Sequence, residues 1–126
     1  MHDPTEGGLS AALYELAEAA GVGLKIERNA IRILPEAGRL CAHFGMNPLG
    51  AISSGALLIC IDSRLEKQTV ARLRRARIPV ARIGTVVPKR NGMTLIENGH
   101  VRPFPQFAVD ELARLFRQSR TRREER

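Results

Sequence analysis

The sequence is poor in several residue types, and each shortage excludes a class of protein. Its 126 residues contain no tryptophan, one tyrosine and four phenylalanines, which disfavours a surface that binds nucleic acid by stacking bases on aromatic rings. Two cysteines and three histidines stand without metal-ligand spacing, so we expect no metal site and no disulfide framework. No apolar run approaches the ~20 residues of a membrane span, and the N-terminus has no signal-peptide pattern. We therefore expect a cytoplasmic protein that does not associate with membranes.

Charge is abundant but unevenly distributed along the chain. Residues 1–63 contain 4 basic and 7 acidic side chains, whereas residues 64–126 contain 16 and 6, which together give the net charge of +7. Such asymmetry leaves open a non-catalytic module that binds nucleic acid or an acidic protein through the basic stretch 64–77 and the arginine-rich end. Most charge runs are solvated surfaces, and the sequence contains no nucleic-acid motif. Nucleic-acid binding is therefore the disfavoured alternative.

Hydrophobic periodicity places the first elements. Apolar residues at helical spacing predict a helix that starts near Leu9 and stops at Gly21. Alternation over residues 22–27 predicts a half-exposed strand, and Pro35 fits the first position of a second helix that stops at Gly45. The unbroken apolar run 55–61 predicts a strand buried on both faces.

The second half of the chain gives further local signals. Ser63 and Glu66 have the spacing of a capping box, which predicts a third helix to about Arg77. Residues 80–87 read as another strand, and Asn98-Gly99 is a hairpin turn. A last helix is expected over residues 108–120. Cys41 and Cys60 lie among apolar neighbours, and we interpret both as buried free thiols.

These elements define the predicted fold. About four helices and five or six strands, alternating first and ending in a hairpin, indicate an α/β class. We expect a layered α/β domain with a mixed β-sheet covered by helices, because the hairpin must be antiparallel. The domain should span residues 1–118, followed by a basic tail over 119–126 that is too polar to pack and should fray.

The opening loop is the principal candidate site. Gly7 and Gly8 stand where a helix begins, so its first backbone N–H groups are not screened by side chains and can bind a phosphate or another anion. Thr5 can support that anion, while His2 and Asp3 can handle protons or a cation as catalytic groups. The plain alternative, which spacing alone favours, is a simple entry into the helix.

A second candidate lies just before the predicted central strand. Ser53, Ser54 and Gly55 form a small-residue loop where ligands gather in α/β sheets. A plain turn explains these residues equally well. Neither candidate contains a cluster of metal ligands.

The opening motif resembles a known family. Residues 2–9 read His-Asp-Pro-Thr-Glu-Gly-Gly-Leu, and this stretch is similar to the start of the C-terminal domain in the AIR synthetase superfamily, especially its hydrogenase expression/formation branch. Further pieces follow in the family's order and extend the resemblance over most of residues 1–103: Tyr14-Glu-Leu-Ala17, Gly21-Val-Gly23, Phe44-Gly-Met-Asn-Pro-Leu49, Ser54-Gly-Ala-Leu-Leu-Ile59 and Ile83-Gly-Thr-Val-Val87.

The resemblance implies a layered domain that packs beside a nucleotide-binding N-terminal half. Enzymes of this superfamily use ATP to activate a carbonyl-type oxygen or to phosphorylate a small molecule, and their magnesium aspartates lie mainly in that other half. We therefore expect ATP and Mg²⁺ to bind only when the N-terminal half is present, and no catalysis by this chain alone. Its expected partners are that half, a small-molecule substrate and further copies of itself in a homo-oligomer.

Three departures from the family pattern affect the expected substrate. Glu6 stands where the maturation proteins commonly have arginine, and Ser54 stands where they have an acidic residue. The maturation proteins also end in a cysteine that carries the group being dehydrated, whereas this sequence ends in Arg126 without one. We therefore expect an ATP-dependent enzyme domain of unassigned substrate, with a carbamoyl-dehydrating maturation factor as the alternative.

Overall fold

The computed structural model describes residues 1–124, and the side chains of residues 1–120. Four strands form one mixed sheet: β1 (Val22–Glu27), β2 (Gly84–Pro88), β3 (Met93–Glu97) and β4 (His100–Pro103). Their spatial order is β2-β1-β3-β4, with β1 antiparallel to β2 and parallel to β3, and β3 antiparallel to β4. The mixed α/β sheet predicted from the sequence is confirmed.

The core lies between this sheet and α1 (Gly8–Ala20). Leu13 and Ala17 of the helix pack with Leu24 and Ile26 of β1, and Leu95 of β3 completes the layer. Leu49 and Phe104 close its edge. The alternation predicted for residues 22–27 is therefore the pattern that turns one face of β1 towards the helix.

Local signals set the ends of several elements. α1 stops at Gly21, which adopts φ 65° and donates its N–H to the carbonyls of Ala17 and Glu18. α2 (Pro35–His43) begins with proline at its first position. Asn98 and Gly99 take φ 50° and 78° and form the tight turn between β3 and β4. These three predictions are confirmed.

Two helices begin at different residues from those predicted. Asp62, rather than Ser63, caps the third helical segment, accepting the Arg64 N–H at 2.9 Å ahead of a short 3₁₀ turn (Ser63–Leu65) and α3 (Glu66–Arg75). The last helix, α4 (Glu111–Glu124), starts three residues later than predicted and extends four residues further. The predicted tail is thus helical to Glu124, and the fraying expected of residues 125 and 126 lies outside the described residues.

The predicted strand over residues 55–61 is wrong. This segment is extended but pairs only once, through Leu58, and Leu57, Ile59 and Ile61 are 40–56% exposed. Cys60 is consequently exposed, which corrects its assignment to the core, whereas Cys41 is buried as predicted. The strand predicted over 80–87 is shorter and later, because only residues 84–88 align with β1. The described residues therefore contain four strands instead of five or six.

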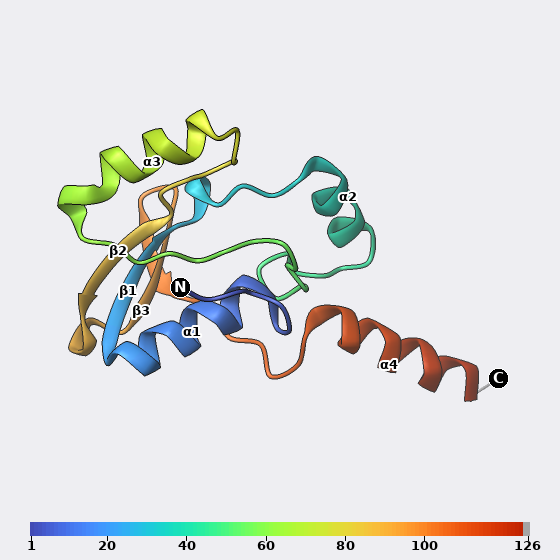
Figure 1. Ribbon diagram of the computed structural model, residues 1–126. Coiled ribbons are helices and arrows are strands. Elements are labelled where there is room, and N and C mark those ends of the chain that lie inside the picture. Colours follow the sequence, from blue (N-terminus) through green and yellow to red (C-terminus); the bar gives the residue numbers. More distant parts are fainter. Residues whose placement is uncertain (125–126) are drawn as a thin grey trace.

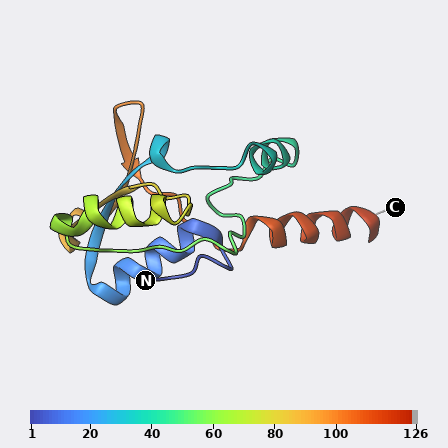
Figure 2. The same ribbon diagram turned by 45° about the horizontal axis from the view of Figure 1, so that its top comes forward.

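The helices differ in how they contact the sheet. α2 and α4 lie at the same end of the molecule, apart from each other and away from the strands (Figure 1, Figure 2). α3 contributes no buried residue, and its arginines face solvent. No helix among residues 1–124 has the length and apolar character required to cross a bilayer.

Candidate functional site

The opening loop is held against a loop more than fifty residues away. His2 and Leu58 form an isolated antiparallel bridge, with N–H to O distances of 3.0 Å and 2.8 Å. Further along, the Ser10 N–H donates to the carbonyl of Leu49 at 2.9 Å. The two candidate regions, residues 2–8 and the stretch before residue 58, therefore lie side by side (Figure 1).

Both glycines of the motif are required by the backbone. Gly7 and Gly8 take φ 72° and 64°, a region that costs other L-residues energy. A Cβ atom on Gly8 would lie 2.2 Å from the carbonyl oxygen of Ala51 and 2.9 Å from that of Leu49. The glycine turn is thus the means by which α1 begins in close contact with the 49–51 loop.

A polar hollow of about 420 Å³ opens beside this turn. It is lined by His2, Asp3, Thr5, Glu6, Ala12, Glu15 and Ile52. The His2 Nε2 lies 2.5 Å from Glu15 Oε2, so an imidazole and a carboxylate are paired in the wall. In the tautomer that donates Nε2–H to Glu15, the other ring nitrogen, Nδ1, is the one that can accept a proton.

The glycine amides are less available to an anion than the motif suggested. The Gly7 N–H already donates to Asp110 Oδ2 at 3.0 Å. Three carboxylates, those of Asp3, Glu6 and Glu15, also line the hollow and would repel a free phosphate. The phosphate role of Gly7, Gly8 and Thr5 remains a prediction.

Magnesium was expected to bind only when the N-terminal half is present. Among residues 1–124, no three histidine, cysteine or acidic side chains are grouped closely enough to hold a metal ion.

The second candidate loop forms a turn next to the hollow. Ser53 Oγ donates to the Ala51 carbonyl at 3.3 Å, the Ala56 N–H donates to the Ser53 carbonyl at 3.2 Å, and Gly55 has φ 90°. Ile52 lines the hollow, but Ser53, Ser54 and Gly55 are not among its lining residues. A role for these three in substrate binding stays a prediction.

Asp110 is a residue of the site region that sequence reasoning missed. Its Oδ1 accepts the N–H groups of Leu112 at 2.8 Å and Ala113 at 3.4 Å, which caps α4. An aspartate ahead of a helical run is a recognisable cap. Its other oxygen reaches Gly7, a residue 103 positions earlier, and nothing local in the sequence indicates that contact.

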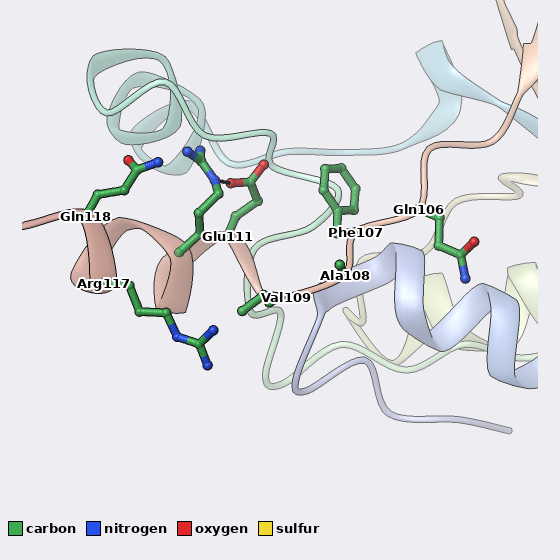
Figure 3. A pocket seen from close by; sticks show the side chains of 8 residues that line it. Gln106, Phe107, Ala108, Val109, Glu111, Arg117 and Gln118 are labelled. Atoms are coloured by element: carbon green, nitrogen blue, oxygen red, sulfur yellow. Dashed lines mark hydrogen bonds and ion pairs between the residues drawn. The ribbon is translucent and has the colours of Figure 1, made fainter. Parts of the chain in front are cut away.

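A second hollow, of about 350 Å³, lies at the start of α4 (Figure 3). The lining residues are Gln106, Phe107, Ala108, Val109, Glu111, Arg114, Arg117 and Gln118. The Glu111 carboxylate accepts from Arg114 at 2.5 Å inside it. None of the predicted site residues contributes to this second hollow.

Comparison with known proteins supports the resemblance in the opening motif. Residues 1–96 match the family described as "AIR synthase related protein, C-terminal domain". The protein "Carbamoyl dehydratase HypE" of Rhodobacter capsulatus is 38% identical over 72 residues, covering 57% of this chain and 21% of that protein.

Solved structures extend the likeness to the fold. The crystal structure of E. coli HypE superposes with a TM-score of 0.77 at 29% identity, covering 90% of this chain and 36% of that one. A structure of "Hydrogenase Maturation Protein HypE in complex with ATP" has a TM-score of 0.74 at 23% identity, covering 86% of this chain and 35% of that one. The chain thus spans about a third of these proteins. It belongs to the family of AIR synthase-related C-terminal domains.

Proposed function

We propose that this chain is the C-terminal domain of a cytoplasmic, ATP-dependent enzyme of the HypE type, completed by an N-terminal ATP-binding half. The reacting group of its substrate is a carbamoyl or related amide group. The observation that supports this most directly is the polar hollow beside the family's motif, with the His2–Glu15 pair in its wall.

Carbamoyl dehydration requires a base, and the wall of the hollow provides one in His2. Converting –CO–NH₂ into –C≡N requires the oxygen to leave and the nitrogen to lose two protons. Transfer of the terminal phosphoryl group of ATP to that oxygen makes it a leaving group, so the products are a nitrile, ADP, phosphate and a proton. A positioned base accelerates such proton removal by roughly 10²–10⁴-fold.

In this proposal His2 is the base and Glu15 orients it. The imidazole Nε2 faces the Glu15 carboxylate at 2.5 Å, and the bridge to Leu58 fixes the His2 backbone. Ser54 carries a hydroxyl rather than a carboxylate and does not line the hollow, so it offers no base there, whereas His2 does line it. Asp3 lies in the same hollow and can hold the amide N–H groups.

A domain replacement tests the proposal. Residues 1–124, which include all of α4, replace the corresponding domain of E. coli HypE, the rest of that enzyme is retained, and ATP-dependent phosphate release is measured with its carbamoylated substrate. The replacement enzyme should be active, and His2→Gln should lower kcat by about tenfold or more because the base is lost.

The matched control is His43→Gln. His43 lies on α2, outside the hollow, where its ring contacts Phe44. Equal activity of the His2 and His43 variants would contradict a role for His2, and an inactive parent replacement would contradict the proposed reaction. Binding to generic RNA with steep salt dependence would instead favour the basic-module alternative.

A further inference from the structure

The first turn of α4 holds both loops of the candidate site. On one side, Asp110 Oδ2 accepts the N–H of Gly7 at 3.0 Å. On the other, the Glu111 N–H donates to the Gly50 carbonyl at 3.0 Å, and Arg114 Nη2 donates to the Gly45 carbonyl at 3.0 Å. One short segment therefore fixes the start of α1 and the 45–50 loop relative to each other.

The contact of Asp110 with Gly7 exceeds what a helix cap requires. One carboxylate oxygen, Oδ1, satisfies the first amides of α4. The second oxygen is free for another donor and accepts from Gly7, which makes a charge-assisted hydrogen bond. A serine or asparagine caps a helix equally well but offers only one acceptor oxygen in its side chain.

The glycine turn has few other constraints on its conformation. Two successive glycines with positive φ have more conformational freedom in the unfolded chain than any other pair, so ordering them is costly. The Ser10 N–H bond to Leu49 holds α1 only beyond the turn. The Gly7 carbonyl accepts the Ala11 N–H at 3.3 Å within the start of α1, whereas the Asp110 bond ties the Gly7 amide to a distant segment of the chain.

We infer that Asp110 is a positioning residue, whose carboxylate holds the Gly7-Gly8 turn in the geometry that the candidate site needs. This inference rests on the proposed function for the role of the site, but the clamp itself can be tested without activity. Asp110 is not among the residues that line the hollow, so it acts through the glycine turn.

The first experiment measures amide hydrogen exchange by NMR in the chain as it exists. Asp110→Asn keeps a cap on α4, since asparagine caps as well as aspartate. With its one acceptor oxygen on the cap, asparagine has only an NH₂ group to place opposite Gly7, and this group cannot accept the Gly7 N–H. Gly7 should then exchange at least about tenfold faster, because a charge-assisted bond is lost. The amide of Gly21, at the far end of α1, should be unchanged.

Asp62→Asn is the matched control. Asp62 caps the turn before α3 through the same kind of bond, to the Arg64 N–H at 2.9 Å, and lies outside the hollow. It should leave Gly7 exchange unaltered. Asp110→Ser also preserves a cap, so it provides a second variant for the same measurement if the asparagine variant does not fold. Unchanged Gly7 exchange in both folded Asp110 variants would overturn the clamp, as would equal acceleration in the Asp62 control.

The second experiment asks whether the clamp serves the site. In the domain-replacement enzyme, Asp110→Asn should lower kcat about tenfold or more in the folded protein, whereas the Asp62→Asn control should leave kcat unchanged. Unchanged kcat with accelerated Gly7 exchange would overturn the positioning role. If the parent replacement is inactive, the proposed function fails, and the exchange experiment still decides the clamp.

Discussion

At the scale of single residues, the backbone geometry predicts how particular substitutions change the stability of the domain. Gly8 is the sharpest case because its φ of 64° disfavours a side chain and the nearby Ala51 carbonyl leaves no room for one. A valine or alanine at this position introduces both a steric clash and backbone strain. Loss of anion binding in such a variant could therefore not be attributed to screening of the helix N–H groups.

Gly8→Ala should destabilise the domain by more than about 2 kcal/mol, through left-handed strain and overpacking together. Gly45→Ala is the control, because Gly45 has φ 61° but no atom within 4 Å of the added Cβ. Gly45→Ala should lower the free energy of unfolding by about 1 kcal/mol, from the left-handed backbone strain alone. Urea unfolding of the two variants measures the difference, and equal losses would show that the Ala51 contact is not rigid.

Tyr14 provides a pH test. Partial burial raises its pKa above 10, and its hydroxyl donates to the Phe104 carbonyl at 2.7 Å. Because the folded state holds this proton more tightly than the unfolded state, the contribution to stability is complete below about pH 10 and is lost as the pH rises through the folded-state pKa.

The ultraviolet absorbance of tyrosinate measures this titration directly, since the chain has one tyrosine and no tryptophan. The native protein should titrate at higher pH than the urea-unfolded protein. Tyr14→Phe should remove the alkaline loss of stability attributed to this residue. Coincident native and unfolded titrations would contradict the effect of burial.

Among the elements, the segment 55–61 shows how a pattern can be read wrongly. A short apolar run is typical of a buried strand, but the same run can lie extended on the surface when no neighbouring strand pairs with it. Here only Leu58 is bridged, by His2, and the side chains on either side of it are exposed.

The two thiols should therefore differ in reactivity. Cys60 should react quickly with a thiol reagent in the native protein, whereas Cys41, which is 6% exposed, should react only after unfolding. Cys60→Ser removes the fast phase and identifies it. Slow labelling of both thiols would mean that residues 55–61 are covered in solution.

At the scale of the whole molecule, apolar side chains remain uncovered. Those on α2 and α4 include Leu40 and Phe116, which are 57% and 61% exposed. The segment 55–61 adds Leu57 at 56%. Large apolar surface of this kind is usually covered by association.

We expect a dimer or larger species at tens of micromolar, measured by sedimentation. Association through apolar surface should persist at high salt, whereas contacts between charged surfaces should weaken. A monomer at all concentrations would contradict the prediction, and dissociation by salt would assign the contacts to the arginine-rich surfaces instead.

The sequence by itself determined the family and most local structure. The glycine stop of α1, the proline start of α2 and the Asn98-Gly99 turn depend on the backbone preferences of those residues alone, so they could be predicted. The ordered motifs indicated the family that residues 1–96 match.

Only the tertiary structure decided which distant residues meet. The exposure of Cys60, the pairing of His2 with Glu15 and the bond from Gly7 to Asp110 each depend on how separate segments pack. The local backbone preferences of a residue do not indicate which residues it contacts a hundred positions away. The position of the glycine turn, and with it the geometry of the candidate site, is therefore a property of the folded chain.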